Sequence, residues 1–588
     1  MKKLFLAYNI LSNSQKKNFV GVFFITILGT LLETFGISII MPMIDFVMYP
    51  NKVFQIKNLN FITKHYSEND VSQLIFAGVF LIVFVFSIKN LFLAYQIHFQ
   101  SKFSFRIQEE LSESFFKNYL GRPYKFFITT NTSKILRNTI GEVNSFVGYV
   151  LQPSLIILTE GLVLVSLTFL LIYIDPTATL LTFTILGGLG FVYNSYSSSR
   201  VAMWGKSRQH HEGLKIKVVQ ESFSGIKAVK LLEDPCPFTD RFKLHNMKGA
   251  QAARKQYASQ QMPKLILEVL AIIGIAVVVI VLFGYEQENA QNLPKLGTMM
   301  FALFRLLPCL SRIVQSSQAI TYGKPCIDVL ARELNSLPEV SKVLSKNNLS
   351  KFKDSFVMSK VSFKYPNEKT NALNDISIKV ARGTSVGIIG ESGAGKSTLV
   401  DLSMGLLSPE KGTIQIDGEI LNEAVSFSDW ISKVGYVPQE IFLTDESMRN
   451  NIAFGIKENL IDEHQIWRVL QDANLDEFVR SLPDGLNTQM GERGVRLSGG
   501  QRQRIGIARA LYGNPEFIVL DEATSALDVE TEESIVTSLN KFKGDKTFLI
   551  IAHRLSALKN CDYFYCLKDG QVFKEGKMEE VLKTSSSK

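Results

Sequence analysis

A glycine-rich segment with a lysine and two hydroxyl residues is the strongest chemical signal in the sequence. It follows an apolar run at 386–389, precedes a helical pattern at 399–407, and reads Gly390-Glu391-Ser392-Gly393-Ala394-Gly395-Lys396-Ser397-Thr398. Glycines allow successive backbone N–H groups to point inward, and the N-terminus of the next helix adds further donors for phosphate. Lys396 would reach the β- and γ-phosphates of a nucleotide, and the Ser397 hydroxyl would hold Mg²⁺. The sequence therefore predicts a strand, a phosphate loop and a helix.

A pair of carboxylates marks a second element of the same chemistry. The apolar run 517–520 is typical of a buried parallel strand, and it ends in Asp521 and Glu522. Asp521 would hold the hydration shell of Mg²⁺, and Glu522 is placed to polarise a water for in-line attack on the γ-phosphate. Acidic pairs also begin helices, but the phosphate loop upstream favours catalysis.

A second anion site is expected in the same part of the chain. Four residues precede a helical pattern at 505–511: Ser498, Gly499, Gly500 and Gln501. A helix N-terminus with such residues binds anions, yet one domain does not need two sites for one ATP. We therefore expect this site to serve the ATP of another subunit, in a dimer with ATP sandwiched at the interface.

Tyr365 is the candidate for contact with the base. It lies before the phosphate loop, with Pro366 after it. An aromatic ring there would stack on adenine, although a tyrosine next to a strand is more often a packing residue.

Composition divides the chain into a membrane part and a soluble part. At 588 residues it is too long for one core. Six apolar segments can each cross a hydrocarbon core of about 30 Å: 19–48, 72–98, 145–173, 176–199, 262–284 and 297–320. We expect an α-helical transmembrane domain at 1–336, a linker at 337–353, and an α/β nucleotide-binding domain of P-loop type at 354–588.

The charge pattern indicates orientation. The net charge is +9, but no basic stripe with interleaved aromatics indicates a nucleic-acid partner. The long connections at 99–144 and 200–261 are rich in Lys and Arg, which places them, both termini and the phosphate loop in the cytoplasm. Their helical patterns break near 123–127 and 231–235, and we expect these turns to contact the ATP-binding part.

Basic residues inside the predicted spans are candidates for a substrate cavity. They are Lys89, Lys264, Arg305 and Arg312. A charge within the membrane is costly unless it faces water or a partner, and four cations around one cavity would suit a phosphate or pyrophosphate group. The alternatives are snorkelling at the span ends, or ion pairs with the acidic residues Glu33, Glu160 and Glu268.

The order of these motifs resembles the nucleotide-binding domain of ABC transporters. The remaining matching residues are Gln439, Ser525-Ala526-Leu527-Asp528 and His553. Six spans fused ahead of that domain are similar to the half-transporters of exporter type, so the resemblance covers nearly the whole chain. It implies that the protein is an ATP-hydrolysing translocase with ATP and Mg²⁺ as cofactors.

The resemblance also implies roles for single residues. Tyr365 would stack on adenine, Gln439 would sense Mg²⁺ and the transmembrane helices, and Ser498 with Gly500 would contact the partner's γ-phosphate. Glu522 would be the catalytic base, His553 would contact the γ-phosphate, and Asp528 would link the two sites. Because each motif is intact, a homodimer with two working sites is expected.

The membrane part has a narrower resemblance to bacterial lipid-linked oligosaccharide flippases. It rests on Glu33-Thr34-Phe35-Gly36-Ile37-Ser38, on Met41-Pro42 and on the four basic residues. It implies a polyprenyl-pyrophosphate glycan as an anionic lipid-linked substrate in the bacterial inner membrane. Lys89 and Lys264 stand where arginines are expected. The alternatives are an exporter of lipid A, peptides or drugs, and, in another class, a nucleotide-gated channel or regulatory receptor.

Overall fold

The computed structural model describes most of the chain. The described residues are 2–40, 42–44, 71–174, 176–284, 293–335, 351–366, 368–421, 426–491, 494–495, 497–523, 529–552 and 558–582. The chain divides into two compact units. The first comprises Met1–Arg122 and Thr130–Pro338, and the second comprises Pro123–Thr129 and Glu339–Lys588. The predicted domain bounds remain predictions, and most of the expected linker lies outside the described residues.

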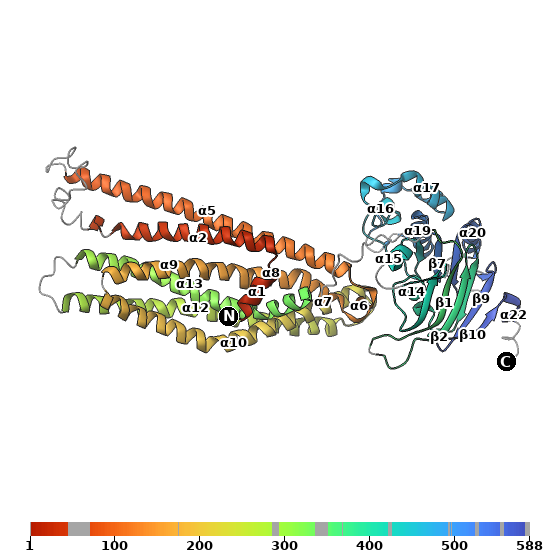
Figure 1. The fold of residues 1–588 in the computed structure, drawn as a ribbon, viewed down its shortest axis with the longest axis horizontal. Helices are drawn as coiled ribbons and strands as arrows, with labels where there is room; N and C mark the ends of the chain where they lie inside the picture. The colour runs from red at the N-terminus through yellow and green to blue at the C-terminus, as the bar shows by residue number, and fades with distance from the viewer. Residues whose placement is uncertain are drawn as a thin grey trace. The chain divides into compact units, whose positions relative to one another are not determined.

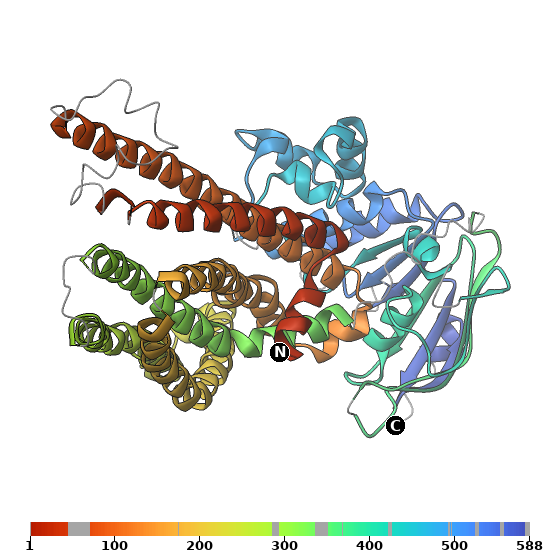
Figure 2. The same cartoon turned by 60° about the vertical axis from the view of Figure 1, so that its left-hand side comes forward.

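Long helices that run side by side form the first unit (Figure 1). They are α1 (Lys2–Ile10), α2 (Asn13–Ser38), α5 (Val71–Leu120), α7 (Thr132–Leu136), α8 (Val143–Phe146), α9 (Gln152–Ile174), α10 (Pro176–Ser224), α11 (Ile226–Lys230), α12 (Cys236–Gly284) and α13 (Leu293–Asn335). Two π-helical segments, η4 (Arg137–Glu142) and η5 (Val147–Leu151), join α7, α8 and α9. Helices α2 and α5 lie together in both views (Figure 2). Helices α5, α10 and α12, with 50, 49 and 49 residues, continue well beyond the predicted spans, as their helical patterns indicated.

Three helical stretches of the described chain are long and apolar enough to cross a membrane. They are Asn13–Ile44, Ile75–Leu120 and Thr132–Tyr173. Helices α10, α12 and α13 cover the other three predicted spans, but many of their side chains there lie outside the described set. The count of six spans therefore remains a prediction. Large apolar side chains of α5, such as Phe76, Phe80 and Leu91, are exposed, as expected for a surface that meets lipid or another helix.

Close helix packing holds α10 against α13. A Cβ atom on Gly205 would lie 2.2 Å from the carbonyl oxygen of Tyr322, so the two backbones meet where α10 has no side chain. Tyr322 is fully buried, and its ring packs edge-on against Tyr149 with centroids 5.1 Å apart. This contact fixes the position of the helix that carries Arg305 and Arg312.

Two sheets and the helices that cover them form the second unit. The four-stranded antiparallel sheet has the order β2-β1-β4-β5, and the six-stranded sheet has the order β10-β9-β3-β8-β7-β6. The strands are β1 (Ser355–Phe363), β2 (Leu373–Ala381), β3 (Ser385–Gly390), β4 (Lys411–Ile416), β5 (Glu419–Ile420), β6 (Val434–Val437), β7 (Phe517–Asp521), β8 (Thr547–Ile551), β9 (Tyr563–Lys568) and β10 (Gln571–Gly576). The helices are α6 (Tyr124–Thr129), α14 (Lys396–Ser403), α15 (Ser426–Ile431), α16 (Met448–Ile452), α17 (Glu463–Asp472), α18 (Asp476–Ser481), α19 (Gly499–Tyr512), α20 (Val529–Asn540) and α22 (Met578–Leu582), with 3₁₀ turns η8 (Glu458–Leu460) and η9 (Gly485–Asn487).

The larger sheet positions the phosphate loop and the carboxylates. Strand β8 lies between β3 and β7 and is parallel to both, so the phosphate loop and Asp521 emerge at the same edge. Ligands of open α/β sheets bind at the carboxyl ends of parallel strands. The predicted strands at 386–389 and 517–520 are confirmed as parts of β3 and β7.

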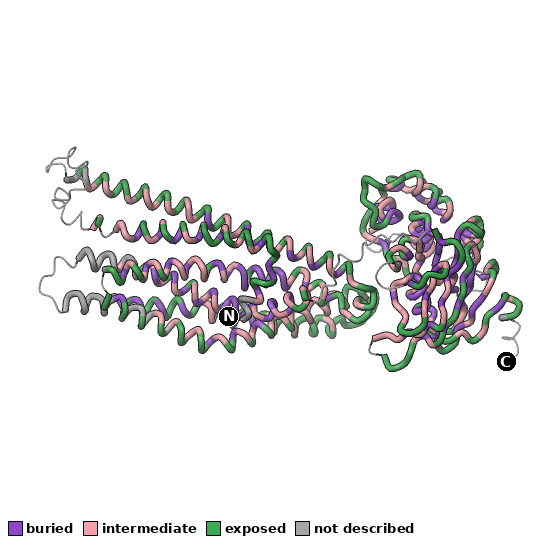
Figure 3. The backbone as a smooth tube through the Cα atoms, in the orientation of Figure 1, coloured by how far each residue is buried: buried purple, intermediate pink, exposed green. Residues whose placement is uncertain are grey.

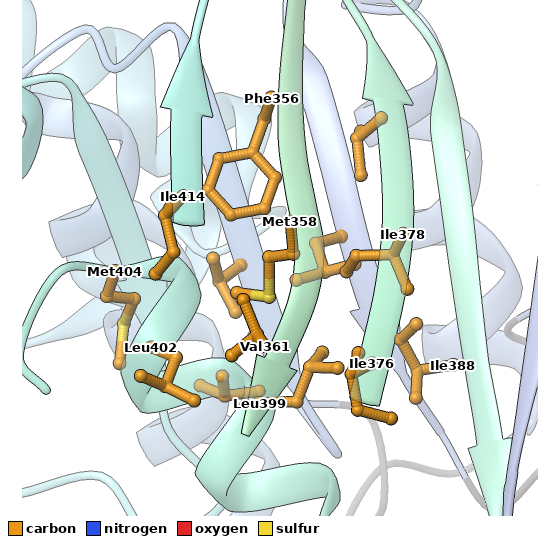
Figure 4. Close-up of a cluster of buried hydrophobic side chains, with 14 of the residues drawn as sticks. Phe356, Met358, Val361, Ile376, Ile378, Ile388, Leu399, Leu402, Met404 and Ile414 are labelled. Carbon is orange, nitrogen blue, oxygen red and sulfur yellow. The ribbon is translucent and has the colours of Figure 1, made fainter. Parts of the chain in front are cut away.

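Apolar side chains from both sheets and α14 form one core (Figure 4). Phe356, Met358 and Val361 of β1 meet Ile376 and Ile378 of β2 there. Leu399 and Leu402 pack against this core from α14, the helix that follows the phosphate loop in the sequence. Buried residues are concentrated in the interior of this unit (Figure 3). Each buried side chain of this size contributes about 1.5–3 kcal/mol, so the loop is mounted on a rigid base.

Candidate functional site

The phosphate loop joins β3 to α14 in a conformation that requires glycine. Gly393 and Gly395 have φ angles of 83° and 96°, in the left-handed region. A Cβ on Gly395 would lie 2.6 Å from Leu373 Cδ2 and 2.8 Å from the Ala372 carbonyl oxygen. The Lys396 ammonium group donates to the carbonyl oxygens of Gly390, at 2.7 Å, and Glu391, at 3.0 Å. This arrangement holds a positive charge against the loop, which fits a phosphate group.

Oxygen ligands suited to Mg²⁺ stand on neighbouring elements. Ser397 lies exposed in the first turn of α14, and Asp521 ends β7. Burial raises the pKa of Asp521, the charge of Glu522 adds to the rise, and a hydrogen bond from Tyr436 opposes it. Hydroxyl and carboxylate oxygens are the donors that Mg²⁺ prefers, so the residues fit this ion.

Two residues that sequence reasoning missed surround Asp521. Burial raises the pKa of Asp401 to about 6, and the charge of Asp521 adds to the effect. Tyr436 belongs to β6, which pairs with β7. Burial likewise raises the pKa of Tyr124, in the segment that groups with this unit, and the charge of Asp401 adds to that rise. Only the fold brings these groups together, since they lie on separate elements.

Glu522 and Gln439 are in direct contact. The Gln439 side-chain amide donates to Glu522 Oε2 at 2.7 Å. The backbone of Glu522 adopts a left-handed φ of 50°, and its N–H donates to the Ile551 carbonyl at the end of β8. A non-glycine residue in this region of φ is uncommon, and such strain is concentrated at functional sites. The proposed base is thus fixed by its own backbone and by Gln439.

Tyr365 packs beside the phosphate loop. Its ring meets Phe363 edge-on with centroids 5.1 Å apart, and its hydroxyl lies 3.1 Å from Thr398 Oγ1. Tyr365 is therefore a packing residue, and its hydroxyl connects it to α14. Because the ring is only half-buried, it can also stack on adenine.

We expect Tyr365→Ala to raise the Kd for ATP about tenfold, because stacking of a base on an aromatic ring is worth about 1–3 kcal/mol. Tyr365→Phe keeps the ring and loses only the contact with Thr398, so its Kd should stay close to that of wild type. Fluorescent-nucleotide titration of both variants checks this. Equal weakening in both would show that the hydroxyl, rather than the ring, matters.

Ser498 caps α19, and the cap uses the side chains of two residues of the predicted anion site. Ser498 Oγ accepts from the Gln501 N–H at 3.2 Å, and Gln501 Oε1 accepts from the Ser498 N–H at 2.9 Å. The Ser-x-x-Gln spacing at 498–501 is a sequence signal of this capping box. Gly499 and Gly500 form the first turn of this 14-residue helix. The contact of this segment with a partner's ATP remains a prediction, and His553 and Asp528 lie outside the described residues.

In the first unit, ion pairs connect two of the four predicted cations. Arg305 Nε contacts Glu33 Oε1 at 2.5 Å, and Arg305 Nη2 lies 3.5 Å from Glu160 Oε2. Arg312 Nη1 contacts Glu160 Oε1 at 2.6 Å. Both arginines therefore form ion pairs with two of the acidic residues considered as partners, Glu33 and Glu160.

Arg305 and Arg312, with their partners Glu33 and Glu160, line a cavity of about 430 Å³. Amide and hydroxyl side chains of α5 and α9 also line it, together with four apolar ones: Gln96, Gln100, Ser101, Ser104, Gln152 and Thr159, and Leu93, Ile97, Leu155 and Ile156. The side chain of Arg312 is 56 % exposed. A cavity with two guanidinium groups in a predicted span can accept an anionic group.

The two lysines differ from this arrangement. Among the described residues, neither Lys89 nor Lys264 lines the cavity. The Lys89 ammonium group lies 4.3 Å from the Phe86 ring centroid, and its side chain lies near Gly36, on the helix that carries Glu33. Lys264 is exposed on α12. The structure thus brings Arg305 and Arg312 together, places Lys89 on α5 beside Gly36 of α2, and leaves Lys264 outside the cavity.

Comparison with known proteins supports the nucleotide site and the membrane unit separately. The family model of ABC transporters matches residues 373–525, and that of the ABC transporter transmembrane region matches residues 19–307. An ATP-dependent lipid A-core flippase of Cupriavidus pinatubonensis is 29% identical over 82% of this chain and 81% of its own. A protein of the same name from Pseudoalteromonas translucida is 29% identical over 80% of each chain. The solved structure of a bacterial Atm1-family ABC exporter with ATP bound shares the fold, with a TM-score of 0.79, 23% identity, and coverage of 98% of this chain and 97% of that one. The chain therefore belongs to the ABC transporter family: it has the fold of an ABC exporter, and it joins a transmembrane region to a nucleotide-binding domain that couples ATP hydrolysis to transport.

Proposed function

We propose that this exporter flips an anionic, glycan-bearing lipid across the bacterial inner membrane, and that the lipid is a polyprenyl-pyrophosphate-linked oligosaccharide. The observation that carries the proposal is the cavity that holds Arg305 and Arg312 within predicted spans. A guanidinium group can bind two oxygens of one phosphate group at once. A pyrophosphate has two phosphate groups, so it can bind both arginines in this way. The amide and hydroxyl side chains among the lining residues would form hydrogen bonds with sugar hydroxyls.

We propose further that two copies act together, with cytoplasmic nucleotide-binding domains. ATP binds to the phosphate loop of one copy and to the α19 N-terminus of the other. Lys396 holds the β- and γ-phosphates, and Glu522, positioned by Gln439, polarises the attacking water. Ser397, Asp521 and Gln439 would hold Mg²⁺, which would supply charge stabilisation for phosphoryl transfer. Closure and reopening of the dimer would drive the membrane unit.

A lipid A-core molecule is the second candidate, because the relatives above carry that name. Like the first candidate, it is a lipid with an anionic, glycan-bearing head group. Apolar peptides or drugs would leave the arginines without a ligand. The family's coupling of hydrolysis to transport disfavours a gated channel or a regulatory receptor.

The test is lipid-stimulated ATPase activity of the protein in nanodiscs. We expect a polyprenyl-pyrophosphate glycan to stimulate hydrolysis severalfold, and the double variant Arg305→Gln, Arg312→Gln to lose this stimulation while basal hydrolysis persists. The control is Arg332→Gln, an exposed arginine later in α13. If wild type hydrolyses ATP but lipid A stimulates it instead, the second candidate replaces the first. If both lipids have no effect, the anionic-lipid proposal fails.

A further inference from the structure

One carboxylate in the cavity wall binds both arginines. Glu160, on α9, is only 4 % exposed. Its Oε1 faces Arg312 at 2.6 Å, and its Oε2 faces Arg305 at 3.5 Å. The two arginines are seven residues apart on α13, which places them two turns apart on one face. Glu160 therefore bridges two successive positions that a phosphate-bearing ligand would also occupy.

The bridge is the centre of a chain of ion pairs across three helices. Glu33 on α2 binds Arg305, Arg305 approaches Glu160 on α9, and Glu160 binds Arg312. Cys309, between the two arginines, donates from its thiol to the Glu160 backbone carbonyl at 3.0 Å. This additional contact fixes the backbone of α9 against α13 at the same level.

The charges of the cavity wall cancel. Arg305 and Arg312 contribute two positive charges, and Glu33 and Glu160 contribute two negative ones. Such pairing is what permits charged side chains within a membrane segment. The charges of the two arginines are therefore already neutralised when an anionic head group enters. The head group can bind both guanidinium groups fully only when a carboxylate moves away from them.

We propose that Glu160 is an internal substitute for the substrate's phosphate, an inference that rests on the proposed transport of an anionic lipid. Without lipid, the Glu160 carboxylate holds the guanidinium groups in place. A phosphate replaces it because it offers more acceptor oxygens to the same donors, and repulsion between phosphate and carboxylate then separates Glu160 from Arg312. The α9–α13 contact loosens as a result, so head-group binding becomes a change in helix packing.

This exchange makes Glu160 a specificity-determining residue. A neutral head group cannot displace a carboxylate from two guanidinium groups, because the hydrogen bonds that it offers are weaker than charge-assisted ones. Only an anionic head group then opens the contact. Loss of the Glu160 charge should remove this selection.

The experiment compares Glu160→Gln with wild type in nanodiscs, using two probes: an undecaprenyl-pyrophosphate-linked glycan and the same glycan on undecaprenol without phosphate. For Glu160→Gln, we expect the concentration of the pyrophosphate lipid that gives half-maximal ATPase stimulation to fall about fivefold. We also expect the neutral lipid, inactive on wild type, to stimulate the variant. Glu268→Gln is the matched control, because Glu268 lies in a predicted span of α12, is exposed, and does not line the cavity. Unchanged selectivity in Glu160→Gln would overturn the inference.

A measurement on the unaltered cavity covers the case in which Glu160→Gln does not fold. Spin labels at Phe169→Cys and Phe304→Cys, both exposed on α9 and α13, should move apart with the pyrophosphate lipid and not with the neutral one. No change with either lipid, in protein whose ATPase responds to the pyrophosphate lipid, overturns the inference alone. If that ATPase responds to neither lipid, the proposed function fails with it.

Discussion

Glu522→Gln is expected to lower ATP hydrolysis by about 10²–10⁴-fold, the usual contribution of a positioned general base. The amide is close in shape to the carboxylate, and its carbonyl oxygen can still accept the hydrogen bond that Gln439 donates at 2.7 Å. Local structure and ATP affinity should therefore remain near wild type while water activation is lost.

Phosphate release and ATP binding, measured on the same preparation, separate these effects. Glu477→Gln is a suitable control, because Glu477 is an exposed carboxylate in the first turn of α18. Hydrolysis by Glu522→Gln at more than a tenth of the wild-type rate would show that another group activates the water.

Lys396→Ala is expected to weaken ATP binding by about 10- to 100-fold, because hydrogen bonds to charged groups contribute about 1.5–3 kcal/mol. The ammonium group that now bonds to the Gly390 and Glu391 carbonyl oxygens would be absent when phosphate arrives. Hydrolysis at limiting ATP should fall in proportion.

The measurement is nucleotide titration together with thermal unfolding, since Lys396 is 9 % exposed and its removal affects packing. Lys396→Met keeps the side-chain volume and should lose the same affinity. Lys411→Ala, at an exposed position in β4, should bind ATP like wild type. Unchanged affinity in Lys396→Met would contradict the proposed role of the charge.

Local chemistry of the nucleotide site could be predicted from the sequence because its parts are short and contiguous. Strand, glycine loop and helix follow one another at 385–403, and the carboxylates follow their own apolar strand directly. Contacts between distant segments could not be predicted. The Gln439–Glu522 hydrogen bond joins residues 83 positions apart, and the positions of Asp401 and Tyr436 near Asp521 depend on strand order.

The membrane cations show the same limit. Hydropathy places Arg305 and Arg312 inside a predicted span, but several carboxylates were available as partners. The Arg305–Glu33 pair spans 272 positions of sequence, and only helix packing selects it. The sequence analysis groups Lys264 with the arginines, but its side chain is exposed and does not line the cavity. The direction of a side chain around its helix axis decides this.

Lipid movement is the most direct test of the account. Proteoliposomes would contain the purified protein and a polyprenyl-pyrophosphate glycan with a fluorescent sugar, and a membrane-impermeant quencher would report the leaflet of each labelled lipid. The account predicts ATP-dependent movement of this lipid in wild type, loss of movement in Glu522→Gln, and loss in the variant that carries Arg305→Gln and Arg312→Gln. Robust ATP hydrolysis in wild type with no movement of the lipid would contradict it.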